Sequence, residues 1–129
     1  MNRQIAPSTV APPVANYALA VKSEGAVAWL HTSGIVGVRP DGSLPSDIED
    51  QAAVIWASLQ AILAEAGMGT GDVVSITTYV VAGHRAALAK VMAARDLALQ
   101  GHRVASTLVT VPALARPEWK VEIALIAAR

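Results

Sequence analysis

Apolar residues recur at regular spacing along this chain, and the clearest period is helical. In the middle of the sequence they follow alternating steps of four and three positions, which is the spacing of one face of an α-helix. These positions are Ile48, Ala52, Ile55, Leu59, Ile62 and Ala66. The segment Ser46-Asp47-Ile48-Glu49 has the pattern of a capping box, and Gly67 is typical of a helix end. The sequence therefore predicts a helix between these two signals.

A second helical pattern runs from about His84 to Gln100 and stops at Gly101. Its expected inward residues are Leu88, Val91, Met92 and Leu99. Arg95 interrupts this face, because it stands where an apolar residue is expected.

Five further runs have the composition or alternation of β-strands. They cover residues 17–21, 26–33, 72–82, 105–111 and 120–128. The first two are separated by Gly25 and predict a β-hairpin. The order β-β-α-β-α-β-β, without a repeat or linker, indicates a single α+β domain over residues 1–129, with a mixed sheet and two helices packed on one face.

Two helices cover only one face of such a sheet, yet the strands are apolar on both alternating sets of positions. In the strand 72–82, Val73 and Val81 fall on one set, and Val74 and Val80 fall on the other. Strands buried on both faces have this pattern. A second copy of the chain is the simplest cover for the other face, so we expect a homo-oligomer. The alternative is a face of Ala, Ser and Thr that tolerates water.

Charge and composition exclude several classes of function. Ten Lys and Arg residues balance ten Asp and Glu residues, and no basic run is present, which disfavours a nucleic-acid partner. Cysteine is absent, so disulfides and thiolate chemistry are excluded. Neither a signal peptide nor an apolar stretch long enough for a membrane helix is found, so we expect a cytoplasmic protein without a membrane partner.

Few side chains have the spacing of a known reactive motif. The three histidines, His31, His84 and His102, show no metal-ligand spacing, and Ser33 does not lie in a G-x-S-x-G elbow. No metal site is therefore expected.

Glu122 is the most informative charged residue, because it stands inside the otherwise apolar strand 120–128. Alternation places it on the same face as Lys120 and Ala124. A carboxylate on a partly dry sheet face is costly unless it is paired or functional, so Glu122 is a candidate acid/base. A solvated glutamate beside Lys120 is the other interpretation.

Together these segments resemble the RidA/YjgF family of enamine/imine deaminases, over about residues 17–127. The motifs are Asn16-Tyr17-Ala18-Leu19-Ala20-Val21, Thr32-Ser33-Gly34, the helix from Gln51 to Gly67, Asp72-Val73-Val74-Ser75-Ile76-Thr77 and Val121-Glu122-Ile123. Each motif is short, and their order and spacing carry the resemblance.

The resemblance implies a chorismate-mutase-like fold and a homotrimer with clefts between subunits. It also implies hydrolysis of small imines or enamines to a carbonyl compound and ammonia, without a metal or organic cofactor. Glu122 matches the position that holds the attacking water. Tyr17 and Ser33 match cleft positions, and Gly34 and Thr107, beside Ser33 and Ser106, are included among the expected substrate-binding residues.

One departure from the family pattern concerns the substrate carboxylate. The family's deaminases carry P-x-R-[ST] at the fourth strand, and this arginine binds the carboxylate. Here its position falls at Ser106, or at Ala105 if the register shifts by one, and neither is cationic. Arg103 could substitute only from the loop before the strand. A non-catalytic binding or sensing protein is therefore the alternative function, whereas the endoribonuclease activity named for some relatives is disfavoured by the zero net charge.

Overall fold

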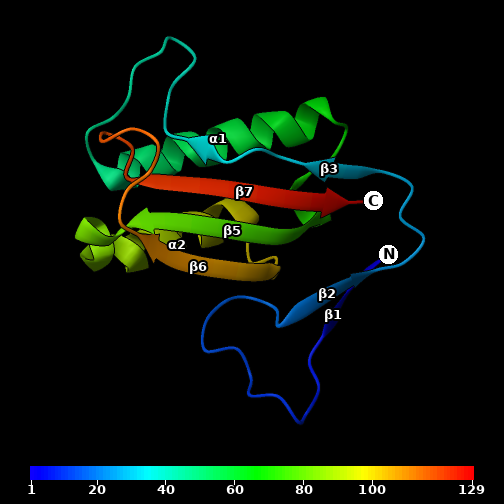
Figure 1. Ribbon diagram of the computed structural model, residues 1–129. Coiled ribbons are helices and arrows are strands. Elements are labelled where there is room, and N and C mark those ends of the chain that lie inside the picture. Colours follow the sequence, from blue (N-terminus) through cyan, green and yellow to red (C-terminus); the bar gives the residue numbers. More distant parts are fainter.

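Two helices lie on one face of a mixed five-stranded sheet in the computed structural model, which describes residues 1–129 (Figure 1). The helices are α1 (Ile48–Glu65) and α2 (Leu88–Leu99). The sheet contains β3 (Trp29–His31), β4 (Ile35–Val36), β5 (Val73–Val81), β6 (Ala105–Val111) and β7 (Val121–Ala128). The α+β class and the two-layer architecture predicted from the sequence are confirmed.

The sheet has the order β3-β7-β5-β6, and β4 also pairs with β7. Strands β5 and β6 run parallel, while β7 is antiparallel to β3, β4 and β5. The longest strands, β5 and β7, therefore lie at the centre, and β6 forms one edge.

The hairpin predicted between residues 17–21 and 26–33 is wrong. Strand β2 (Ala20–Ser23) pairs instead with β1 (Asn2–Ile5), in a separate two-stranded sheet, and β3 pairs with β7. Pairing with β7 places Leu30 against the hydrophobic core, whereas Val27 in the connection stays 93% exposed. A short alternating run specifies a strand, but its partner depends on where apolar side chains find cover.

The starts of both helices also differ from the sequence prediction. Asp47, rather than Ser46, is the N-cap of α1, and its side chain accepts a hydrogen bond from the Glu49 amide at 2.7 Å. Helix α2 begins at Leu88, because residues 82–87 form the tighter 3₁₀ helix η2 (Ala82–Ala87). A second 3₁₀ turn, η1 (Thr70–Asp72), precedes β5. Neither helix has the length and apolarity to span a membrane.

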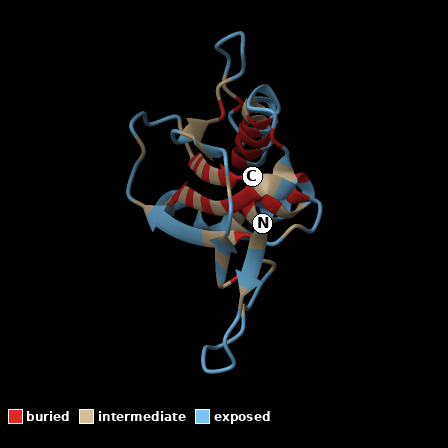
Figure 2. Ribbon diagram, turned by 90° about the vertical axis from the view of Figure 1, so that its right-hand side faces the viewer, coloured by how far each residue is buried: buried red, intermediate tan, exposed pale blue.

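The hydrophobic core fills the space between the helices and the sheet (Figure 2). Burial alternates along β5 and β7, so Val121, Ile123 and Leu125 of β7 point to the core. Glu122, Ala124 and Ile126 consequently point to the opposite face, as the alternation predicted for Glu122. No helix covers this second face, which we call the open face.

One buried side-chain amide of α1 bonds the loop before α1 and the loop before β7. The Gln51 side chain is fully buried, and its Nε2 donates to the backbone oxygens of Pro45, at 2.8 Å, and Glu118, at 3.1 Å. Its Oε1 accepts from the Lys120 amide at 3.0 Å. Gly37 packs directly on this residue, because a Cβ atom there would lie 2.8 Å from Gln51 Cα. Gln51 therefore fixes where β7 begins.

Replacing Gln51 with leucine should destabilise the fold by about 2–4 kcal/mol, because buried backbone groups at three positions lose their partner. Urea denaturation followed by circular dichroism measures this change. Gln60→Leu, at an exposed position of the same helix, is the matched control and should change stability by under about 0.5 kcal/mol. Equal stability of the two variants would contradict the role given to Gln51.

Candidate functional site

The open face of the sheet is a surface of small and polar side chains around one carboxylate. The register places three rows of residues on it: Ala105, Ser75 and Ile126; Thr107, Thr77 and Ala124; Val109, Tyr79 and Glu122. A hollow of about 180 Å³ lies on this face beside the edge residues His31 and Thr32. The face is neither strongly charged nor continuously apolar.

Glu122 lies at one end of this face, against the bend between β3 and β4. Four positions separate His31 from Ile35, but only three separate their partners Ile126 and Ile123, so residues 32–34 form a β-bulge. The bulge brings Gly34 so close that a Cβ there would lie 2.6 Å from Glu122 Cδ. The predicted residues Ser33, Gly34 and Glu122 are therefore brought together.

The Glu122 carboxylate is half-buried and has no cationic partner within the chain. The three ion pairs of the structure, Lys22–Glu24, Lys90–Glu49 and Arg95–Asp96, involve other residues. Lys120, the residue before β7, donates its ammonium hydrogen bond to the Ser46 carbonyl instead. Glu122 therefore forms no ion pair with Lys120.

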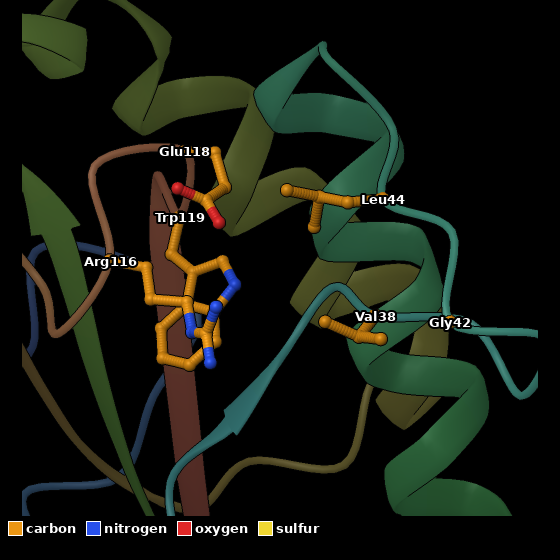
Figure 3. Close-up of a pocket in the computed structure, with 6 residues that line it drawn as sticks. All are labelled: Val38, Gly42, Leu44, Arg116, Glu118 and Trp119. Carbon is orange, nitrogen blue, oxygen red and sulfur yellow. The ribbon is translucent and has the colours of Figure 1, made fainter.

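A second hollow, of about 390 Å³, lies beyond the paired ends of β4 and β7 (Figure 3). Val38 and Leu44 line it from one loop, and Arg116, Glu118 and Trp119 line it from the other. The Arg116 guanidinium carbon lies 5.6 Å from the centroid of the Trp119 ring, a cation–π arrangement. This hollow was not predicted from the sequence.

Tyr17 and Arg103 belong to a second group, at the start of β6. The backbone from Asn16 to Ala18 runs beside residues 103–105, since the Ala18 amide donates to the Val104 carbonyl at 2.9 Å. Arg103 is exposed in the loop before β6, where its Nε donates to Asn16 Oδ1 at 2.9 Å. The loop position that a substitute arginine would need is therefore the position Arg103 has.

Ser106 points to the helices rather than to the open face. It shares a row with the buried Ile76, and its hydroxyl accepts a hydrogen bond from Arg95 Nη1 at 3.1 Å. Ala105 and Thr107, its neighbours in β6, are the residues on the same face as Glu122. Of the two positions at which the family's arginine was expected, Ala105 is the one on the open face, and neither it nor Thr107 is cationic.

The two groups of candidate residues are far apart within one chain. Tyr79, beside Glu122, lies four residues beyond Ser75, the partner of Ala105, which is roughly 13 Å along the strand. The β5 strand also separates β6 from β7. One chain alone therefore does not unite Glu122 with Tyr17 and Arg103.

No three acidic or histidine side chains gather where they could hold a metal ion. Three further residues make structural contacts that were not predicted from the sequence: Asn16, Gln51 and Arg95. Arg95 was detectable as the break in a helical apolar face. The roles of Asn16 and Gln51 depend on contacts between distant segments, which no local pattern signals.

A family model described as endoribonuclease L-PSP matches residues 8–129. The crystal structure of YyfB from Yersinia pestis, described as a protein of unknown function of the conserved Rid family, is similar to this chain with a TM-score of 0.89. Its sequence is 32% identical, and the match covers 99% of this chain and 98% of YyfB. The chain belongs to the RidA/YjgF family. The resemblance in the sequence motifs is thereby confirmed.

Other RidA/YjgF relatives match less of the sequence. TdcF of Escherichia coli, named for the deamination of reactive intermediates, is 36% identical over 50 residues, which are 38% of this chain and 39% of TdcF. A RutC family protein of Aquifex aeolicus is 33% identical over 60% of this chain and 61% of its own length. A crystal structure of TdcF with bound serine has a TM-score of 0.71 at 24% identity, covering 98% of both chains, and is similar in fold.

Gly34→Ala should turn the Glu122 side chain away from the bulge, because the added methyl group would overlap it. The far end of a glutamate can rotate at low cost, so the melting temperature should change by only a few degrees. A crystal structure of the variant shows the carboxylate position directly. Gly83→Ala, where no atom lies within 4 Å of the new Cβ, is the control. An unmoved Glu122 would contradict this packing.

Proposed function

We propose that this RidA/YjgF protein hydrolyses small reactive imines or enamines at clefts between the subunits of a homotrimer. In this reaction water adds to the carbon of the C=N bond, the C–N bond then breaks, and a carbonyl compound and ammonia leave. No redox change occurs, so neither an oxidant nor an organic cofactor is needed. The unpaired Glu122 carboxylate beside the Gly34 bulge is the observation that carries the proposal.

Glu122 would hold and activate the attacking water. Its carboxylate has no ion pair in the chain, so its oxygens remain available as acceptors for a water molecule. The bulge at residues 32–34 places Gly34 against the carboxylate, at a distance that leaves no room for a Cβ atom. A carboxylate held in a partly dry setting is suited to general acid–base catalysis.

Two subunits would be needed to complete the site. Glu122, Ser33 and Gly34 lie at one end of the sheet, and Tyr17 and Arg103 lie at the start of β6. A second copy packed on the open face would cover that face and could place its own Tyr17 group beside Glu122. Thr107, in the central row of the open face, would lie in or near the contact.

Arg103 would bind the carboxylate of a 2-imino acid in place of the arginine missing from β6. It has the loop position and the exposure that this role needs, and its remaining guanidinium N–H groups have no partner in the chain. Ser106 would not contact substrate directly, because its hydroxyl already bonds Arg95 on the helix side.

The second candidate function is non-catalytic binding or sensing of a small molecule in the same clefts. The absence of a cation from the open face of β6 favours it, since Ala105 and Thr107 cannot form a charge-assisted bond. Ribonuclease activity is not part of the proposal, because the net charge is zero and RNA binding depends on phosphate neutralisation.

Ammonia release from enzymatically generated 2-iminopropanoate tests the catalytic proposal. Glu122→Gln keeps the shape of the side chain but removes the base, and should lower the rate by a factor of about 10² to 10⁴. Glu65→Gln, at the exposed end of α1, should leave the rate unchanged. Wild-type release at the buffer rate, with saturable binding of pyruvate, would favour the binding protein instead.

Sedimentation velocity tests the assembly. The proposed trimer has a mass of about 40 kDa, three times the 13.3 kDa of the chain. Thr77→Arg, at the centre of the open face, should produce monomers, because a long charged side chain there would be buried without a partner. Gln60→Arg, at an exposed position of α1, is the control and should remain assembled. A monomeric wild-type protein would contradict the proposal.

A further inference from the structure

Arg95 is a fully buried cation in a helix whose other inward residues are apolar. It is 3% exposed and lies on α2, in the layer between the helix and β6. Its one ionic partner is the adjacent Asp96, whose Oδ1 accepts from Arg95 Nε at 3.0 Å and from Nη2 at 2.9 Å. Asp96 is partly exposed, with a side chain 38% accessible.

The other contacts of Arg95 reach two segments that carry candidate site residues. Nη1 donates to Oγ of Ser106, the second residue of β6, at 3.1 Å. Nη2 donates to the carbonyl of Asn16, the residue before Tyr17, at 3.3 Å. The Asn16 side chain in turn accepts from Arg103 Nε at 2.9 Å. Asn16 thus links the buried guanidinium of Arg95 to the exposed guanidinium of Arg103.

Stability alone does not explain a buried arginine at this position. A well-packed apolar residue of similar size commonly stabilises a protein as much as a buried ion pair does, because removing charges from water is costly. Arg95 instead contributes a defined geometry, because its planar guanidinium holds several acceptors at set angles. The acceptors outside its own helix are the Asn16 carbonyl and the Ser106 hydroxyl.

We propose that Arg95 is a positioning residue that holds the Asn16–Tyr17 segment against β6 and, through the Asn16 amide, orients Arg103 toward the substrate carboxylate. The inference rests on the proposed function for the role of Arg103, but the relay Arg95–Asn16–Arg103 exists in the chain irrespective of catalysis. In this arrangement the cation missing from β6 is supplied from the adjacent loop and kept in place from behind the sheet.

Nuclear magnetic resonance of the arginine Nε–H groups tests the relay without any turnover. In the wild-type protein the Arg103 Nε–H should exchange slowly with solvent, and its signal can be assigned with Arg103→Lys. Asn16→Ala removes its acceptor, and Arg95→Met removes the group that fixes Asn16, so both should accelerate its exchange at least tenfold. Arg85→Met, at an exposed position of η2, is the control and should leave it unchanged.

Binding of pyruvate, the keto acid produced from 2-iminopropanoate, tests the function of the relay. Arg95→Met and Asn16→Ala should each raise the dissociation constant about tenfold, and combining either with Arg103→Gln should weaken binding no further than Arg103→Gln alone. This non-additivity is the sign of a shared effect through one residue. A purely structural Arg95 would instead lower the melting temperature and leave Arg103 exchange and the dissociation constant unchanged.

The outcomes separate the relay from the proposed reaction. Slow Arg103 exchange that both substitutions abolish supports the relay even if no ammonia is released, in which case only the deaminase proposal fails. Arg103 exchange that is unaffected in folded Arg95→Met overturns the relay. If Arg95→Met does not fold, Arg95→Lys keeps the charge but loses the planar geometry, and unchanged Arg103 exchange in that variant overturns the relay equally.

Discussion

The packing of both helices on one face of the sheet is the constraint from which the other features of this protein follow. The core side chains of β5 and β7 use one set of alternating positions, so the second set is left on a face that neither helix covers. Glu122 belongs to that second set. The carboxylate is therefore kept out of the core and lies on the face opposite the helices.

Backbone geometry then decides what the carboxylate can do. The bulge at residues 32–34 presses Gly34 against Glu122, and the fully buried Gln51 fixes the loop from which β7 starts. Both contacts are made near the first residues of β7, Gly34 with Glu122 and Gln51 with the residues just before the strand. They restrict the positions that the Glu122 side chain can take, which is what the proposed water-activating role requires.

Features that depend on the periodicity of one element could be predicted from the sequence. Features that depend on which segments pair or pack together could not. The helix from Ile48, the strand 72–82 and the outward direction of Glu122 depend on periodicity, which acts within one element. The wrong hairpin and the shifted start of α2 involve short segments whose local signals are weak. The faces on which Ala105 and Ser106 lie depend on the register between β5 and β6, which needs the partner strand.

The amino-acid sequence by itself determined the fold class and the family, and it indicated Glu122 as a candidate, because these depend on the order and spacing of residues. Only the tertiary structure decided which residues gather around that carboxylate, that Ser106 faces a buried arginine, and that Asn16 joins Arg95 to Arg103. The two contacts of Asn16 join residues about 80 or more positions apart. Such contacts form only when the packing of the helices on the sheet brings the segments together.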